Sequence, residues 1–359
     1  MAVNLRIPRL AGQRAAFTST RSTPAGLIAG LVCLLMAAGS LAAERTGSAS
    51  LDEYLKRLGY VGIGWLPSQH AQPILTGKIN GKKLGFLVDS GCSITLVNEE
   101  TSKGLKRLGE LDAVLKDSVF GAETTNASLL VIDELALGRA QFFNEPAKVK
   151  ELRFDFIHTL YDAILGLDFL LRNCCLVDCK EEKLYVRGGK PSGQQVRALA
   201  ETLRKSGFIE VEMDLKEWFA FTAVAQVNGE PVRLMIDTGS FVTVLHESQV
   251  SRFGLKPLRQ GTTGSFIPAE MQGGMVGLGS IGKHKLRAVK VASLKLGSRE
   301  WNNIPVGIGD LRAWGIERAS PTGRELQGLL GIDMLRTQGA LIDFASGKLW
   351  LRPVSKKAK

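Results

Sequence analysis

Two short segments of the sequence each place an aspartate, a hydroxyl residue and a glycine directly after an apolar run. They are residues 86–91, FLVDSG, and residues 234–239, LMIDTG. A carboxylate that follows such a run is at least partly buried, and a buried charge is costly unless it takes up a proton or finds a partner. Because the pattern occurs twice, the partner we predict for Asp89 is Asp237. Two carboxyl groups held close together share one proton, so one can deprotonate a water molecule while the other polarises a carbonyl group.

The neighbouring residue types suit this chemistry and argue against others. Gly91 and Gly239 allow the backbone to turn tightly beside each acid, where a β-carbon would obstruct it. No covalent intermediate is needed, because the activated water is the nucleophile. A serine or cysteine nucleophile would need a paired histidine, for which the sequence gives no signal. The four histidines also lack ligand spacing, so we expect neither a metal nor another cofactor.

Internal duplication positions the two acids. Each half contains an apolar run, residues 73–79 or 221–227, that ends in Asn-Gly, the strongest short signal for a β-hairpin. The aspartate follows nine residues after each asparagine. Two later blocks also align without gaps, and the same order in both halves indicates duplication rather than chance. The aligned blocks are 135–149 with 294–308, and 164–186 with 329–351.

Each acid segment is followed later in the chain by two apolar residues, a glycine and a short predicted helix. This combination resembles the retropepsin-like aspartic peptidases. The residues that carry the resemblance are Asp89-Ser90-Gly91 with Ile164-Leu165-Gly166, and Asp237-Thr238-Gly239 with Leu329-Leu330-Gly331.

The resemblance implies a mainly β fold in which two tandem retropepsin-like β-barrel lobes are related by a pseudo-two-fold axis. Many members of the family carry one copy and dimerise, whereas two copies in one chain resemble the bilobal arrangement of pepsin. The family pattern implies that Ser90 and Thr238 tie the two acid loops together across the axis. Cys92 departs from the alanine or serine expected at its position.

The flaps that would close over a substrate are predicted between the acid loop and the next aligned block. In the second half, residues 277–282 match the spacing of a dinucleotide-binding fingerprint. That segment precedes a β-like run, 286–292, instead of opening a helix, so a flap is the better interpretation. The candidate flap residues are Phe120 and Gly121 in the first half, and Gly277 and Gly279 in the second.

Two further pairs of acids recur at equivalent positions in the two halves, but they are not followed by a hydroxyl residue and a glycine. We interpret Asp168 and Asp333 as caps of short helices, and we expect Asp178 and Asp343 to face turns. Neither pair is a candidate for catalysis.

The first 43 residues have the layout of a secretory signal. Four arginines without an acid precede an apolar core, residues 25–38, and small residues follow at 39–43. The alternative is an uncleaved membrane anchor, since 25–43 is only just long enough to span a bilayer. We therefore expect an exported protein, periplasmic or secreted, with anchoring to the inner membrane as the alternative.

The predicted organisation has two lobes with short additional segments. A helix is expected at 51–58 and another at 194–204. The segments are a signal peptide or anchor at 1–43, an N-terminal extension at 44–72, the first lobe at 73–188, a linker with a helix at 189–216, the second lobe at 217–354, and a basic tail at 355–359.

Composition excludes several classes of protein. With 45% hydrophobic and 23% charged residues, the chain is neither disordered nor fibrous. Its net charge is +11, but the basic residues are scattered and no aromatic-studded basic stripe indicates nucleic-acid binding. Four cysteines follow residue 43, and we expect buried thiols, with one long-range bridge to Cys92 as the alternative.

The function that these patterns favour is an exported aspartic endopeptidase, acting on peptides or proteins as a monomer. A catalytically silent module that binds peptides or a partner in the same groove is the alternative, and the presence of both acids argues against it. A third class, a purely structural assembly module, would give the two acid loops no function.

Overall fold

The computed structural model describes residues 50–67, 72–111, 127–150, 161–216, 220–257, 286–312 and 326–354. The chain divides into two units, Met1–Gly47 and Ser48–Lys359, and every described residue belongs to the second. No helix among the described residues is long and apolar enough to cross a membrane.

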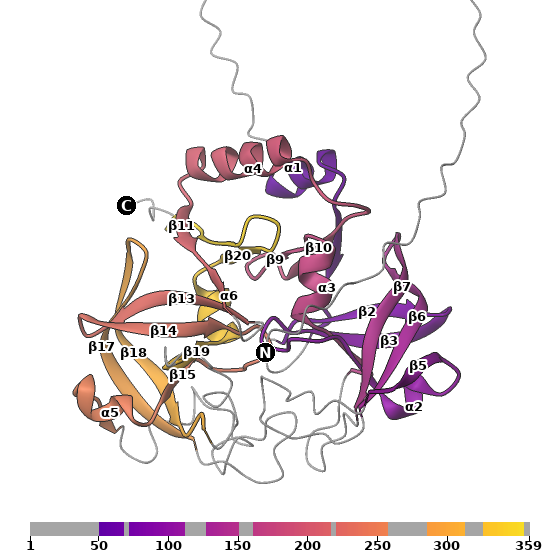
Figure 1. Cartoon of the computed structure of the whole chain (residues 1–359). Coiled ribbons are helices and arrows are strands. Elements are labelled where there is room, and N and C mark those ends of the chain that lie inside the picture. The colour runs from indigo at the N-terminus through magenta and orange to yellow at the C-terminus, as the bar shows by residue number, and fades with distance from the viewer. Residues whose placement is uncertain are drawn as a thin grey trace, which may run out of the picture. The chain divides into compact units, whose positions relative to one another are not determined.

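The first lobe is a sheet closed on itself. Its strands follow the order β2-β3-β8-β4-β7-β6-β5, and an additional pairing between β2 and β6 closes six of them into a ring (Figure 1). The elements are β2 (Ile74–Ile79), β3 (Lys82–Val88), β4 (Leu96–Asn98), α2 (Glu99–Ser102), β5 (Lys106–Leu111), β6 (Ala127–Leu137), β7 (Ala140–Lys150), β8 (Ala163–Leu165) and α3 (Leu167–Arg172).

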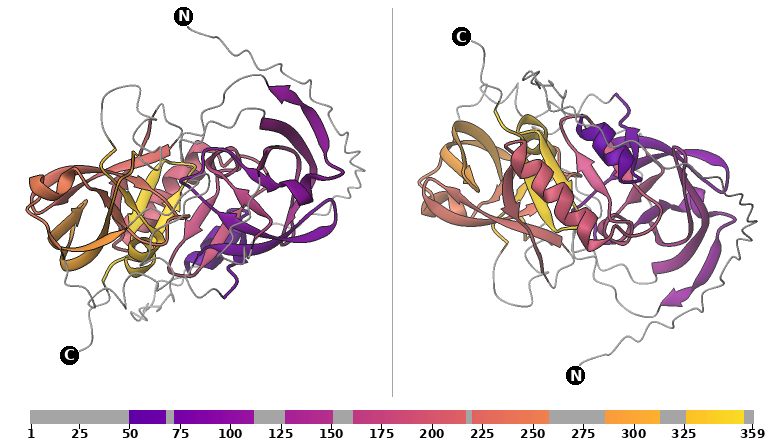
Figure 2. Two further views of the ribbon diagram at one scale, coloured as in Figure 1. Left: turned by 90° about the horizontal axis from the view of Figure 1, so that it is seen from below. Right: turned by 90° about the horizontal axis from the view of Figure 1, so that it is seen from above.

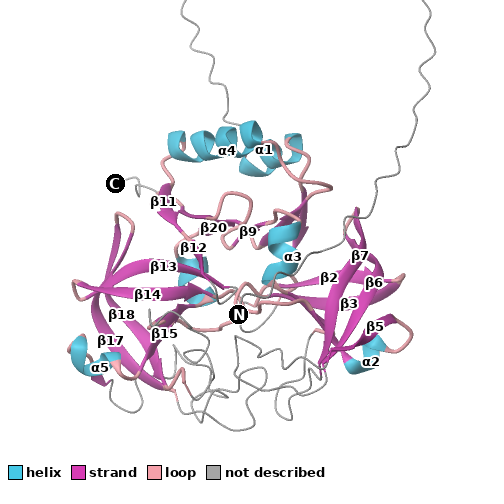
Figure 3. Cartoon of the chain, in the orientation of Figure 1, coloured by secondary structure: helices cyan, strands magenta, loops and turns pink. Residues whose placement is uncertain are grey.

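The second lobe repeats this plan. Its order is β12-β13-β14-β19-β15-β18-β17-β16, and pairing of β13 with β17 closes the ring. The predicted mainly β fold with two closed lobes is confirmed, and strands predominate in both (Figure 3). The elements are β12 (Asp214–Lys216), β13 (Ala220–Val227), β14 (Glu230–Ile236), β15 (Val244–His246), α5 (Gln249–Arg252), β16 (Lys256–Pro257), β17 (Arg287–Leu296), β18 (Arg299–Gly309), β19 (Gly328–Leu330) and α6 (Ile332–Thr337).

Both predicted Asn-Gly hairpins are confirmed. Asn80 and Gly81 have φ of 47° and 81°, and Asn228 and Gly229 have φ of 51° and 87°. Positive φ at both central residues defines the hairpin turn that matches strand twist and for which Asn-Gly is preferred. These turns hold β2 against β3 and β13 against β14, so that each hairpin delivers its aspartate at the end of its second strand.

A third sheet joins the two halves of the chain, in the order β1-β10-β9-β20-β21-β11. At its centre, β9 and β20 pair antiparallel with Val177 opposite Ile342, two positions that are equivalent in the aligned repeats. The strands are β1 (Val61–Gly64), β9 (Leu176–Asp178), β10 (Lys183–Val186), β11 (Ile209–Glu212), β20 (Ala340–Asp343) and β21 (Lys348–Leu351).

Two helices pack on this joining sheet. Helices α1 (Leu51–Arg57) and α4 (Gly193–Lys205) confirm the two helices predicted outside the lobes. Leu55 of α1 and Leu203 of α4 share one apolar cluster with Tyr185 and Trp350 of the sheet. Figure 1 shows both helices beside this sheet. In the right view of Figure 2, α4 lies across the strands of the sheet.

The duplication includes these helices. Residues 51–64 match 199–212 at the same offset that separates Asp89 from Asp237, with leucine, glutamate and glycine recurring in both. The strand after each helix joins the sheet in the same register, since Val61 faces Val186 and Ile209 faces Leu351. Each repeat therefore begins with a helix and an edge strand of the joining sheet.

One ion pair of the joining sheet is present at only one of the two positions that the repeats make equivalent. Arg352 donates from Nη2 to Oδ2 of the buried Asp178 at 2.5 Å. At the equivalent positions, Asp343 instead accepts from the Ser346 hydroxyl at 2.6 Å. Nε and Nη1 of Arg187 are buried without a hydrogen-bond partner in the described part of the chain.

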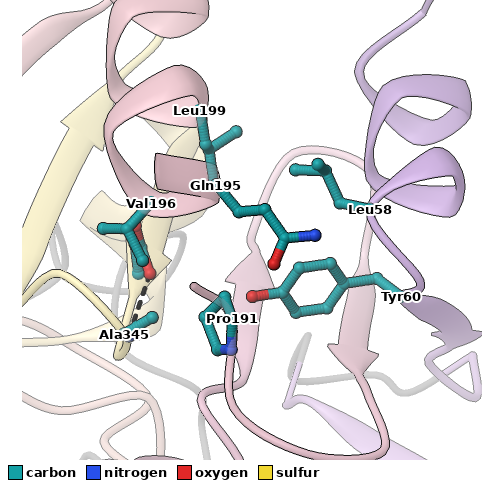
Figure 4. Close-up of a pocket in the computed structure, with 8 residues that line it drawn as sticks. Leu58, Tyr60, Pro191, Gln195, Val196, Leu199 and Ala345 are labelled. Atoms are coloured by element: carbon teal, nitrogen blue, oxygen red, sulfur yellow. Dashed lines mark hydrogen bonds between the residues drawn. The ribbon is translucent and has the colours of Figure 1, made fainter. Parts of the chain in front are cut away.

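The residue beside each arginine accounts for this difference. Gly339 leaves room for Arg352, because a β-carbon there would lie 2.9 Å from the arginine Cδ. The first repeat has Cys174 at the equivalent position, and Arg187 lies over the Tyr60 ring, 5.3 Å from its centroid. A small pocket whose lining includes Asp343 and Tyr60 lies between the end of α1 and the start of α4 (Figure 4).

We expect Arg352→Met to lower the free energy of unfolding by about 3 kcal/mol, because it leaves the fully buried Asp178 without its cation. The matched variant Arg187→Met removes no ion pair, and we expect it to cost less than about 1 kcal/mol. Each arginine also lies over an aromatic ring, so loss of that contact is common to both variants. Urea denaturation at neutral pH measures the difference, and equal losses would contradict the asymmetry.

Candidate active site

The end of a lobe strand positions each predicted acid. Asp89 follows β3, and its N–H donates to the Leu165 carbonyl at 3.1 Å. Asp237 follows β14 and makes the same bond to Leu330 at 3.1 Å. The predicted motifs Ile164-Leu165-Gly166 and Leu329-Leu330-Gly331 therefore form the strands β8 and β19, with their glycines, beside the two acid loops.

The structure brings the two carboxyl groups together. Asp89 and Asp237 lie close enough for each to shift the pKa of the other, and their side chains are buried, with the residues only 3% and 4% exposed. Oδ1 of Asp89 accepts from the N–H groups of Gly91 at 2.8 Å and Cys92 at 3.1 Å. Oδ1 of Asp237 accepts from Gly239 at 2.9 Å and Ser240 at 3.0 Å. Each carboxyl group is thus fixed by its own loop and directed towards its twin.

Burial and mutual repulsion favour a state in which the two carboxyl groups share one proton. Burial raises the pKa of both carboxyl groups, and the negative charge of Asp89 raises the pKa of Asp237 well above its usual range. Backbone N–H groups donate to both carboxyl groups and oppose this increase in each. The two carboxyl groups therefore share one proton and titrate as a unit.

Hydroxyl groups bind the two acid loops across the axis, as the resemblance implies. Thr238 donates from Oγ1 to the Val88 carbonyl at 2.7 Å and accepts from the Ser90 N–H at 3.0 Å. Reciprocally, Ser90 donates from Oγ to the Ile236 carbonyl at 2.8 Å and accepts from the Thr238 N–H at 3.1 Å. All four bonds join one repeat to the other, so each acid is positioned relative to its twin.

The two glycines of the acid loops leave room for the carboxyl group of the opposite repeat. A β-carbon at Gly91 would lie 2.6 Å from Cγ of Asp237, and one at Gly239 would lie 2.4 Å from Cγ of Asp89. Neither glycine has a positive φ. A β-carbon would therefore be obstructed at either position, as the sequence indicated, and the obstructing group is the carboxyl group of the other repeat. In the first loop, the Cys92 N–H donates to the Asp89 carbonyl at 3.3 Å and closes a turn.

Threonine and aspartate pairs that the sequence did not identify support the acid loops. Oδ1 of Asp168 accepts from the Thr95 N–H at 2.7 Å and from its hydroxyl at 2.8 Å. Thr243 donates from Oγ1 to Asp333 at 2.8 Å in the second repeat. The helices begin instead at glycine N-caps without a side-chain cap bond, so the prediction that Asp168 and Asp333 cap them is wrong.

The remaining predicted residues are placed as follows. The candidate flap residues Phe120, Gly121, Gly277 and Gly279 lie outside the described residues. Cys92, Cys174, Cys175 and Cys179 are buried thiols that form no disulfide, as we expected. Asp178 and Asp343 accept N–H bonds from the turns that follow them, which confirms that prediction. In the described part of the chain, no group of three or more histidine, cysteine or acidic side chains could hold a metal ion.

Two closed barrels, each with an Asp-hydroxyl-Gly loop meeting the other, define a bilobal acid-protease fold of the retropepsin-like kind. A family model described as aspartyl protease matches residues 75–169 and 223–334, which together exceed half of the chain. The chain belongs to this aspartyl protease family.

Two solved structures match the chain at low sequence identity. An aspartic proteinase from Irpex lacteus is 11% identical, with 83% of this chain and 98% of that chain covered and a TM-score of 0.48. A retropepsin-like aspartic protease from Rickettsia conorii is 22% identical, with 40% of this chain and 89% of that chain covered and a TM-score of 0.26. No curated protein matches the chain.

Proposed function

We propose that the protein is an aspartic endopeptidase that hydrolyses peptide bonds with Asp89 and Asp237. The observation that supports this most is the close pair of buried carboxyl groups contributed by two repeats of one chain, whose loops are joined by reciprocal hydroxyl bonds. Because two close, buried carboxyl groups share one proton, one of them can act as general acid while the other acts as general base.

The first half of the reaction adds water to the peptide carbonyl. In the proposed mechanism Asp89 starts negative and takes a proton from a water molecule, while Asp237 starts protonated and transfers its proton to the carbonyl oxygen. The hydroxide bonds to the carbonyl carbon and gives a tetrahedral diol. At this point Asp89 is protonated and Asp237 is negative.

The second half breaks the carbon–nitrogen bond and restores the site. Asp89 donates its proton to the amide nitrogen, and Asp237 takes a proton back from one hydroxyl of the diol. The amine leaves, the carbonyl forms again, and the products are a carboxylic acid and an amine. No metal or covalent intermediate takes part in these steps.

Product masses from a mixed peptide library test this proposal. Purified protein should generate paired fragments whose masses sum to the parent peptide plus one water. A silent peptide-binding module would retain peptides without cleaving them, and that result would overturn the proposal.

We also propose that the protein works as a monomer on peptide or protein substrates. The hydroxyl bonds between Ser90 and Thr238 and the β9–β20 pairing both lie within one chain, so no second copy is needed to assemble the dyad. The basic residues are scattered along the sequence and do not form an aromatic-studded basic stripe. We therefore propose no nucleic-acid partner.

We further propose export, on the basis of the arginine-rich start, the apolar core and the small residues before position 44. Protein sequencing of the periplasmic or secreted form should give an N-terminus at residue 43 or 44. A full-length product retained in the membrane would support the anchor alternative, and a full-length cytosolic product would contradict export.

A further inference from the structure

Exposed basic residues gather where two hairpins of the first lobe lie side by side. Strands β2 and β3 form one hairpin, β6 and β7 form the other, and β2 pairs with β6 (Figure 1). The exposed basic residues of these hairpins are Lys78, Lys82, Lys83 and Arg139. In the described part of the chain, none of the four side chains forms a hydrogen bond or an ion pair, so their charges are not neutralised there.

Two of these lysines lie directly opposite each other. In the β2–β3 ladder Lys78 faces Lys83. Ile79 and Leu84, the next residues along the two strands, belong to the main core, so alternation directs both lysines outwards. Like charges directly opposite each other on a sheet are destabilising. The fold gains nothing from this repulsion, which favours a role for the two charges in binding.

An exposed aromatic ring lies on the same outer face. Phe143 of β7 is 60% exposed, and its neighbour Phe142 belongs to the main core. Across the ladder Lys78 faces Ala136, and Ala136 faces Gln141, two residues before Phe143. With strands about 4.8 Å apart and a rise of about 3.3 Å per residue, the Cα atoms of Phe143 and Lys78 are roughly 12 Å apart.

Two acids lie near the ring and do not cancel the positive charge. Glu134 faces Phe143 across the ladder, and its carboxylate accepts from the Gln141 amide at 3.2 Å. Asp133 is exposed beside it. The four cations therefore outnumber the two acids. We name the surface formed by the cations and the ring the basic face, and it consists of Lys78, Lys82, Lys83, Arg139 and Phe143.

The second repeat builds the same hairpins without a basic face. The three lysines are replaced there by a glutamine, a glutamate and a proline, the arginine by a serine and the phenylalanine by an asparagine. These equivalents are Gln226, Glu230, Pro231, Ser298 and Asn302, and all of them are exposed. Because the strands pair in the same way in both lobes, folding does not require the basic face.

A negatively charged lipid surface fits this combination of side chains best. Each lysine or arginine near an anionic bilayer strengthens binding about fivefold. A phenylalanine side chain enters the boundary between the headgroups and the acyl chains. Basic residues alone suit any acidic partner, whereas an exposed aromatic ring among them is typical of a surface that binds membranes.

We propose that the basic face of the first lobe docks on an anionic lipid bilayer, with Phe143 entering the interface and the four cations contacting headgroups. This inference does not depend on the peptidase function, because no residue of the basic face belongs to the dyad. It also differs from anchoring by residues 25–43, since the contact is made by the folded part of the chain.

Lysine footprinting of the full chain tests the contact. The protein is mixed with vesicles of equal parts phosphatidylglycerol and phosphatidylcholine, or of phosphatidylcholine alone, and acetylated sites are quantified by mass spectrometry. Lys78 and Lys83 should react roughly fivefold more slowly on the anionic vesicles only, and high salt should restore their reactivity. Lys290 and Lys295, exposed on β17, are internal controls that should react equally on both. Equal reactivity of all four lysines on both vesicles would overturn the proposal, and an acidic protein would then be the better occupant.

Variants of the basic face separate the ring from the charges. The ratio of docked to free protein follows from the protection of Lys78 and Lys83. Phe143→Asn, which introduces the residue of the second repeat, should lower this ratio about tenfold, because the ring no longer enters the interface. Arg139→Ser should lower it about fivefold.

The matched control is Val224→Asn, which removes an apolar side chain that is 52% exposed on the second lobe. It should leave the ratio unchanged. Melting temperatures of Phe143→Asn and Val224→Asn should equal that of wild type, which distinguishes lost docking from lost folding. An unchanged ratio for Phe143→Asn, or an equal loss for Val224→Asn, would overturn the role of the basic face.

Discussion

Asp89→Asn and Asp237→Asn will each abolish peptide cleavage, with rate losses of about 10⁴-fold or more, because either change removes the shared proton. Asparagine at position 89 cannot take a proton from water, and asparagine at position 237 cannot give one to the carbonyl oxygen. Initial rates on a peptide that wild type cleaves measure the loss. Asp133→Asn, which changes an exposed acid in β6, is the control and should retain wild-type activity.

Both asparagine variants should remain folded. Asparagine keeps the shape of aspartate and a carbonyl oxygen that can accept from the loop N–H groups, and it removes a buried ionisable group. Melting temperatures within a few degrees of wild type, about the shift that 1 kcal/mol produces, would show this. The rival arrangement has separate Asp89–Asp89 and Asp237–Asp237 sites in a dimer, and it predicts that each single variant keeps about half of the activity.

Gly239→Ala should be almost as damaging to catalysis, although it leaves both acids in place. The new β-carbon would lie 2.4 Å from Cγ of Asp89, so this carboxyl group must move by roughly an ångström. Misplacement of a reacting group by about that distance costs on the order of 100-fold in rate. We expect kcat to fall by at least this factor, with Gly91→Ala giving a similar loss through Asp237.

The appropriate control is Gly64→Ala at the end of β1, where a β-carbon would meet no atom within 4 Å. This variant should retain both activity and stability, since the added methyl group contacts nothing. Comparing kcat with the unfolding transition separates displacement of the dyad from general destabilisation. Wild-type kcat for Gly239→Ala would show that the carboxyl groups are not held as closely as the structure indicates.

Local sequence signals were sufficient for the parts of the fold that depend on few residues. Asn-Gly predicts a hairpin because the turn needs positive φ at both positions, and both hairpins have that geometry. The acid after an apolar strand identified Asp89 and Asp237, because burial of a charge demands a partner wherever it occurs. Helices α1 and α4 were also predicted from their own residues.

Long-range contacts account for what sequence reasoning missed. Asp168 looked like a helix cap because its true partner, Thr95, lies 73 residues away in another element. The requirement for Gly239 comes from Asp89, in the opposite repeat. Nothing near Asp168 in the sequence indicates its contact with Thr95.

One missed feature did leave a signal. Leu55 and Gly59 recur as Leu203 and Gly207 at the offset that relates the two catalytic candidates, which shows that the duplication begins before the first lobe. The loss of symmetry at Arg187 was not predictable in the same way, because it depends on how Cys174 and Gly339 fill space beside the two arginines.

The most direct test of the central claim, that one chain builds one proteolytic dyad, is the wild-type cleavage rate per chain across a dilution series. The measurement uses a peptide identified from the library and sedimentation at each concentration. We predict cleavage at a constant rate per chain down to concentrations where only monomer is present. A rate per chain that falls as the protein dissociates, or a folded monomer that cleaves no peptide, would contradict the account.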